Sequence, residues 1–198
     1  MIRALVALAL ASAAFSPLPA MAETRSLIIA GGCFWCVEKD FDQVPGVVST
    51  TSGYSGGTME NPTYRNHEGH REVVLVEYDP AKTDYATLVN VFFHSIDPTD
   101  AGGQFCDRGH SYTTAVTYTT DEEKAAAEKA KADAESALNQ PVVTAIEKAG
   151  PFWKAEDYHQ DYYRKNPIRY AYYRSGCGRD ARVEQVWGMA AHQGIEGM

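Results

Sequence analysis

The spacing of apolar residues predicts strands and a helix in the first part of the chain. An apolar run over residues 25–30 predicts a short buried strand, which leads into Gly31-Gly32, where the backbone must turn tightly. Apolar residues then recur at helical spacing over residues 33–43. Residues 47–54 and 73–78 are rich in β-branched and apolar side chains, so each predicts a strand.

The second part of the chain predicts longer helices between short strands. A helix is predicted from about Asp84 to before Asp97, followed by a strand over residues 112–119 that is rich in Thr, Tyr and Val. A Thr-Asp-Glu-Glu capping box then begins an Ala/Lys/Glu helix over residues 121–138, and residues 142–146 predict another strand. The rest of the chain is an aromatic, polar tail.

This order of elements indicates the fold class. Over residues 27–119 the order is strand, helix, strand, strand, helix, strand, which is typical of a split β-α-β core. We therefore predict an α+β fold. It is a two-layer α/β sandwich with a ferredoxin-like core, to which an additional helix, a strand and the aromatic C-terminal tail are attached.

The first residues have the pattern of an export signal. Arg3 is followed by an apolar run over residues 4–15 and by the small-x-small site Ala20-Met21-Ala22. The run is shorter than the roughly 20 apolar residues that cross a bilayer, so we expect no membrane span. We expect residues 1–22 to be a signal peptide, and residues 23–198 to form a single exported domain, periplasmic or secreted.

Composition excludes one class of partner. Asp and Glu number 26 against 18 Lys and Arg, and this acidic balance argues against nucleic acid. The domain is large enough to bury a core without disulfide bonds, so redox chemistry is the favoured use of its 4 cysteines. A single Cys-x-x-Cys pair without a second ligand pair does not suit zinc, and we expect no metal. We expect a monomer.

Cys33 has the surroundings of a reactive thiol. It follows a glycine turn, begins a predicted helix and precedes Phe34 and Trp35. Free N–H groups and the helix dipole at that position favour thiolate. A helix terminus contributes about 0.3–1 kcal/mol, up to roughly 2, so it lowers a thiol pKa by only about one unit. A neighbouring acid or the substrate must complete the activation.

Gly32-Cys33-Phe34-Trp35 resembles the active-site motif of the A class of peptide methionine sulfoxide reductases. Other blocks that resemble this family follow in the same order: Gly53-Tyr54-Ser55-Gly56-Gly57, Asn61-Pro62-Thr63-Tyr64, Gly69-His70-Arg71-Glu72-Val73-Val74, Tyr78-Asp79-Pro80 and Ala155-Glu156-Asp157-Tyr158-His159-Gln160. The resemblance extends from about Leu27 to Cys177. It implies reduction of the S epimer of methionine sulfoxide, free or in proteins, with Cys33 as nucleophile and a sulfenic acid intermediate.

The resemblance also implies roles for other side chains. Phe34 and Trp35 are expected to line a pocket for the substrate methyl group. The groups expected around the sulfoxide oxygen are Glu72, Tyr64 and Tyr112, and Asp107 is expected to hold the site through water or hydrogen bonds. A carboxylic acid buried among rings keeps its proton, so Glu72 is a chemically reasonable proton donor.

A second thiol can reset the sulfenic acid by forming a disulfide. Cys177 is the first candidate because its neighbouring glycines suggest a flexible tail, and because family members often resolve from a C-terminal cysteine. Cys36, three residues after the nucleophile, is the second candidate, and Cys106 is the third. No bound cofactor is expected, and the external reductant is expected to be a thioredoxin-like protein.

Two other functions compete with this one. Cys33 and Cys36 form a Cys-x-x-Cys pair after a strand, which is typical of thiol-disulfide oxidoreductases. The other alternative is an exported binding module that uses its aromatic residues for recognition and pairs all its cysteines. Turnover of a sulfoxide by Cys33 would separate the predicted enzyme from both.

Overall fold

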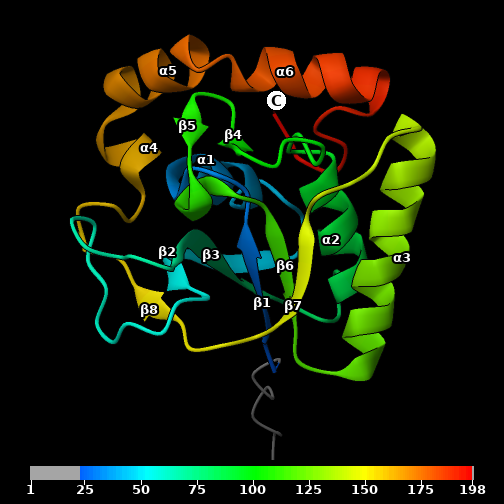
Figure 1. Ribbon diagram of the computed structural model, residues 1–198, viewed down its shortest axis with the longest axis horizontal. Coiled ribbons are helices and arrows are strands. Elements are labelled where there is room, and N and C mark those ends of the chain that lie inside the picture. The colour runs from blue at the N-terminus through cyan, green and yellow to red at the C-terminus, as the bar shows by residue number, and fades with distance from the viewer. Residues whose placement is uncertain (1–22, 198) are drawn as a thin grey trace, which may run out of the picture.

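The computed structural model describes residues 23–197 (Figure 1). The predicted signal peptide, residues 1–22, lies outside the described residues. Among the described residues, no helix is both long and apolar enough to cross a membrane.

A mixed sheet forms the centre of the molecule. Its strands are β1 (Arg25–Ala30), β2 (Val47–Ser55), β3 (Arg71–Tyr78), β6 (Ala115–Tyr118), β7 (Ala145–Lys148) and β8 (Trp153–Lys154). They are ordered β7-β6-β1-β3-β2-β8, so β1 and β3 lie centrally. β1 runs antiparallel to both of its neighbours, and only the β6–β7 pair of this sheet is parallel.

Helices lie beside the sheet, and two of them pass over one of its ends. They are α1 (Phe34–Phe41), α2 (Tyr85–Phe93), α3 (Asp121–Leu138), α4 (Tyr162–Lys165), α5 (Pro167–Gly176) and α6 (Arg179–Trp187), with the 3-10 helices η1 (His110–Tyr112) and η2 (Gly188–Ala190). A hairpin of β4 (Gly103–Gln104) and β5 (Asp107–Arg108) lies under α5 and α6, which follow one another across the top of the view in Figure 1.

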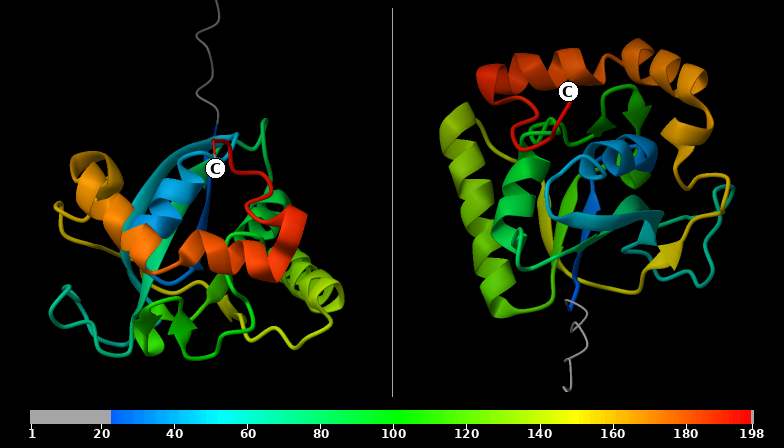
Figure 2. Two further views of the ribbon diagram at one scale, coloured as in Figure 1. Left: turned by 90° about the horizontal axis from the view of Figure 1, so that it is seen from above. Right: turned by 180° about the vertical axis from the view of Figure 1, so that it is seen from behind.

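The core lies between the sheet and helices α1 and α2. Alternate residues of β1 divide between two apolar clusters, because successive strand side chains point to opposite faces. Leu27 and Ile29 join the large cluster with α1 and α2, whereas Ile28 and Ala30 join a small cluster on the opposite face. Helix α3 stands outside α2, as both views in Figure 2 show, and buries small alanine side chains against it.

The predicted α+β class is confirmed, and β1 has the predicted bounds. Two predicted strands are shorter than expected. The strand predicted over residues 112–119 begins only at Ala115, because η1 occupies the residues before it, and the last predicted strand begins at Ala145. The aromatic C-terminal tail contains the regular helices α5 and α6, and Val183 of α6 is fully buried. The segment around Cys177 therefore joins two helices and is not the flexible segment that its glycines suggested.

Candidate active site

The turn before α1 fixes the position of Cys33. Gly32 has φ +85°, and a Cβ there would lie 2.6 Å from the Cβ of Gln104, so a larger residue does not fit. Cys33 is the N-cap of α1, as its place after the glycine turn predicts, and its carbonyl accepts hydrogen bonds from the amides of Cys36 and Val37. Arg179 holds the turn from α6 by donating to the Gly31 carbonyl at 3.1 Å.

The thiols of Cys33 and Cys36 are free, buried and hydrogen-bonded to each other. Burial, the bond to Cys36 and the nearby carboxyl of Glu72 raise the pKa of Cys33 well above its ordinary value. The prediction of a lowered pKa is therefore wrong for the free protein. Here burial disfavours the Cys33 thiolate by more than the helix terminus stabilises it.

Cys36 has the opposite tendency. The hydrogen bond from Cys33 and the positive charges of Arg179 and Arg174 lower the pKa of Cys36 to about 7, against the effect of burial. Arg174 itself is held by ion pairs with Asp40 at 2.8 Å and Asp180 at 2.6 Å. Of the two sulfurs, Cys36 is therefore the one on which a negative charge is favoured.

Glu72 lies beside the start of α1, where the resemblance places it. Its Oε2 accepts a hydrogen bond of 3.0 Å from the amide of Phe34, the residue after the nucleophile. The side chain is only 2% exposed, and burial raises the pKa of Glu72 to about 8. At neutral pH this carboxyl group therefore carries a proton that it can donate.

Tyr64 and Tyr112 face the same pair of groups from two other segments. Burial raises the pKa of both hydroxyls, and the charges of Glu72 and Cys33 raise them further. Both tyrosines are therefore protonated donors at neutral pH. Tyr64 is 41% exposed and its amide donates to Glu156, so it lies at the open side of the site.

Phe34 and Trp35 differ in how far they reach the surface. Phe34 is 1% exposed and packs against His159 with ring centroids 4.9 Å apart. Trp35 is partly exposed, stacks on Tyr162 at 3.7 Å and donates from Nε1 to Nδ1 of His159. His159 thus has a hydrogen-bonded structural place, and the two rings form an apolar wall beside Cys33.

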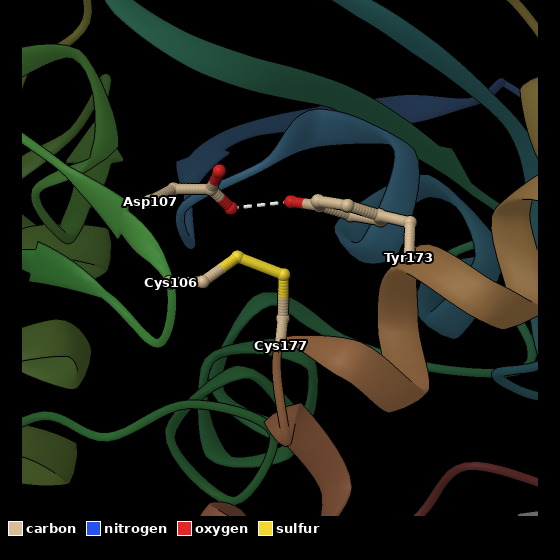
Figure 3. The surroundings of a disulfide bond; sticks show 4 residues. All are labelled: Cys106, Asp107, Tyr173 and Cys177. Atoms are coloured by element: carbon tan, nitrogen blue, oxygen red, sulfur yellow. Dashed lines mark hydrogen bonds between the residues drawn. A yellow bond between two sulfur atoms is a disulfide. The ribbon is translucent and has the colours of Figure 1, made fainter.

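Asp107, the last of the predicted site residues, lies on β5 and accepts a hydrogen bond from the hydroxyl of Tyr173 (Figure 3). The same hydroxyl lies near Cys33 and lowers the pKa of that thiol, against the larger effects that raise it. The sequence analysis did not identify Tyr173 as a site residue. Nothing in its spacing distinguishes it from the other tyrosines of α5, such as the exposed Tyr172.

The other two cysteines form a disulfide near Asp107. Cys106 and Cys177 are bonded, with Cα atoms 4.9 Å apart, and the bridge joins the β4–β5 turn to the end of α5 (Figure 3). Cys106 is exposed, unlike the buried thiols of α1. Asp107 completes a cluster of ligand-type atoms with them, but sulfurs joined to each other are not thiolates and do not suit zinc.

The arrangement combines three chemical capacities. A buried dithiol can be oxidised to a disulfide, a protonated carboxyl group can donate to an oxygen, and tyrosine hydroxyls can stabilise charge on that oxygen. The apolar wall suits a thioether group. A substrate with a polarised oxygen on an apolar sulfur fits all of these features.

The chain is similar to known methionine sulfoxide reductases. Residues 25–191 match the family described as peptide methionine sulfoxide reductase. Peptide methionine sulfoxide reductase MsrA 2 of Rhizobium meliloti is 54% identical, covering 91% of this chain and 93% of that protein. MsrA of Bacillus licheniformis is 49% identical, covering 85% and 97%. The structure of methionine sulfoxide reductase A of Corynebacterium diphtheriae has a TM-score of 0.67 at 32% identity, covering 76% of this chain and 79% of that one.

Proposed function

Because the chain belongs to the peptide methionine sulfoxide reductase family and therefore reduces methionine sulfoxide to methionine, we propose that Cys33 is its nucleophile and Glu72 its acid. The observation that carries the proposal is the hydrogen bond from the Phe34 amide to Glu72, which holds the carboxyl group beside the start of α1. The substrate is the S epimer, free or in proteins.

In the first step Cys33 attacks the sulfur of the sulfoxide while Glu72 protonates the oxygen. The S–O bond breaks and the oxygen passes to Cys33, so that thiol and sulfoxide become sulfenic acid and thioether. Tyr64 and Tyr112 donate hydrogen bonds to the oxygen as charge grows on it. Phe34 and Trp35 contact the methyl group, and Asp107 holds the site.

Cys36 resolves the sulfenic acid in the state that the structure describes. Its sulfur is hydrogen-bonded to Cys33, whereas Cys177, the first candidate from the sequence, is bonded to Cys106. Condensation of the Cys33 sulfenic acid with the Cys36 thiol forms one disulfide and releases water. Cys177 can take this role only after the Cys106–Cys177 bridge has been reduced.

An external thiol supplies the two electrons that reopen the disulfide, and we infer that the reductant is a thioredoxin-like protein rather than a bound cofactor. Thiol–disulfide exchange with such a protein needs no prosthetic group. The enzyme acts after export, which is supported by the signal-like pattern of residues 1–22. Recovery of an exported chain that begins near Glu23, read by N-terminal sequencing, tests the export.

The two competing functions lose their support. Thiol–disulfide exchange has no oxygen leaving group, so it does not account for the two tyrosine hydroxyls, Tyr64 and Tyr112, that lie near Glu72 and Cys33. A binding module with all cysteines paired does not agree with the free thiols of Cys33 and Cys36. The family match agrees with neither alternative.

Methionine release in the absence of reductant tests the proposed function. Wild-type protein given excess methionine S-sulfoxide should release about one methionine per chain, since one dithiol is oxidised once. Cys36→Ser should release the same amount and stop at a sulfenic acid that dimedone labels. Cys33→Ser should release none, and release by this variant would contradict the proposal.

A further inference from the structure

His159 connects the buried part of the site to two exposed tyrosines. Its ring packs against Phe34, which lines the site, with centroids 4.9 Å apart. The same ring packs against Tyr64 at 4.6 Å and against Tyr158 at 4.2 Å. His159 is 1% exposed, whereas Tyr64 is 41% exposed and Tyr158 is 57% exposed. Aromatic contacts therefore continue from the site to the molecular surface, where Tyr64 and Tyr158 are the rim tyrosines.

The rim tyrosines come from two segments that are far apart in the sequence. Tyr64 lies in the loop between β2 and β3, and Tyr158 lies in the segment between β8 and α4. The two segments run side by side at one edge of the molecule (Figure 1). Tyr158 has no part in the reaction described above, so its exposed ring beside the site is available for another contact.

Glu156 holds both segments in place. Its Oε1 accepts a hydrogen bond of 2.9 Å from the Tyr64 amide, and its carbonyl accepts one of 2.8 Å from the His159 amide. Thr63 and Asn66 exchange two backbone hydrogen bonds of 2.9 Å around Tyr64. The backbone beside the rim tyrosines is therefore fixed before a substrate arrives, and tyrosine side chains lose little conformational entropy on binding. The exposed rings form a preorganised surface.

The charge state of this surface suits an apolar ligand. Burial lowers the pKa of His159 and raises that of Tyr64, so both rings are neutral at pH 7. The two carboxylates that precede Tyr158 in the sequence have partners of their own, because Glu156 accepts from the Tyr64 amide and Asp157 pairs with Lys154 at 2.9 Å. Ring faces rather than free charges therefore distinguish the surface, and they suit another flat apolar side chain.

A polypeptide substrate can reach this surface, whereas a free amino acid cannot. Neighbouring Cα atoms of a chain are about 3.8 Å apart, so the side chain next to a bound methionine sulfoxide extends beyond the methyl pocket. Phe34 belongs to that pocket, and only the ring of His159 separates it from the rim tyrosines. Free methionine sulfoxide has no neighbouring side chain to place there.

We propose that the rim tyrosines bind the side chain next to the methionine sulfoxide in a polypeptide, and that the enzyme favours an aromatic or large apolar residue at that position. Ring pairs contribute binding beyond the area that they bury. Apolar residues are mostly buried in folded proteins, so oxidised proteins that have partly unfolded are the substrate class that fits. This inference rests on the proposed function, because it requires Phe34 to lie beside the bound substrate.

Three substrates test the inference with the wild-type protein, where Met(O) is methionine S-sulfoxide: acetyl-Phe-Met(O)-Phe-amide, acetyl-Gly-Met(O)-Gly-amide and acetyl-Lys-Met(O)-Lys-amide. We expect kcat/KM for the phenylalanine peptide to be about tenfold higher than for the glycine peptide, mainly through a lower KM, because an added ring contact stabilises the complex. The lysine peptide should resemble the glycine peptide. Equal values for the phenylalanine and glycine peptides, or a preference for the lysine peptide, would overturn the proposal.

Tyr158→Ala should remove most of this preference, and Tyr172→Ala is the matched control, since Tyr172 is an 82% exposed tyrosine of α5. The readout is the ratio of kcat/KM for the phenylalanine and glycine peptides on the same variant, so a general loss of activity cancels. Tyr158→Phe should keep the wild-type ratio, because the ring rather than the hydroxyl makes the contact.

A wild-type ratio in Tyr158→Ala, or an equal fall of the ratio in Tyr172→Ala, would overturn the role of the rim tyrosines. If Tyr158→Ala does not fold, as judged by circular dichroism, the comparison of peptides on the wild-type protein still decides. Methionine release by Cys33→Ser would instead refute the proposed function, whereas a wild-type enzyme that releases methionine without preference between the peptides refutes only this inference.

Discussion

The two cysteine pairs of this chain differ in the properties that control sulfur chemistry. Cys33 and Cys36 lie one helical turn apart, buried and free, next to a protonated carboxyl group. Cys106 and Cys177 are 71 positions apart, reach the surface and are bonded to each other. We propose that the environment of each sulfur, rather than its neighbours in sequence, decides which pair meets the substrate.

The largest effect is expected for Glu72, the acid that lies beside the buried pair Cys33 and Cys36. Glu72→Gln should lower the first-step rate by about 100- to 10,000-fold, because the sulfoxide oxygen loses its proton donor. Since the protonated form is active and the pKa is raised to about 8, the wild-type rate should fall as pH rises through that value. Stopped-time methionine release measures both effects.

Glu77→Gln is the matched control for Glu72→Gln. Glu77 lies on the same strand and accepts a hydrogen bond from Ser49, away from the cysteines. Its replacement should leave the rate and its alkaline limb unchanged. An alkaline limb that persists in Glu72→Gln would show that another group supplies the proton.

The choice of resolving thiol is expected to have the next largest effect. With a thioredoxin-like reductant, Cys36→Ser should slow steady-state turnover by at least about tenfold, because an external thiol replaces an intramolecular one. Cys177→Ser should be slowed less. The two variants are compared by reductant consumption at saturating methionine sulfoxide, and the opposite ranking would make Cys177 the resolving residue.

Opening the exposed bridge should affect stability more than chemistry. Replacing Cys106 and Cys177 together by Ser should lower the free energy of unfolding by about 2–4 kcal/mol, because the unfolded chain regains the freedom of a long closed loop. Urea unfolding measures this loss. Wild-type protein whose bridge has been reduced should unfold at the same urea concentration as the double variant, and an unchanged midpoint would mean that the bridge does not stabilise the fold.

The smallest expected effect concerns the titration of the buried pair. Cys36 has a pKa of about 7, so its labelling by iodoacetamide should increase about tenfold per pH unit below that value and level off above it. Cys33 should react mainly at higher pH. Peptide mapping by mass spectrometry separates the two sites, and labelling of Cys33 first would reverse the assignment.

Local patterns predicted much of the fold. The bounds of β1 and the caps of α2 and α3 follow from neighbouring residues, and Asp84 and Thr120 indeed accept hydrogen bonds from the first turns of their helices. The helices α5 and α6 of the C-terminal tail were not predicted, because they are stabilised by contacts with distant segments. Arg179, for example, bonds to the carbonyl of Gly31 and is 1% exposed.

The site was predictable to the extent that its chemistry is local. Cys33 could be identified from the glycine turn and the helix start, whereas Glu72 required the resemblance to a family, because a glutamate on a strand has no local mark of burial. Tyr173 and the Cys106–Cys177 bridge could not be found, since each depends on contacts between segments far apart in sequence. The direction of the Cys33 pKa shift failed for the same reason, because burial is a property of the tertiary structure.

The central claim is that the buried pair performs the redox step while the exposed pair stays closed. Its most direct test is to treat the protein with one equivalent of methionine S-sulfoxide, block free thiols and map the disulfides by mass spectrometry. The account predicts a new Cys33–Cys36 bond beside an unchanged Cys106–Cys177 bond. A bond between Cys33 and Cys177, or a Cys33 that remains a thiol after methionine is released, would contradict it.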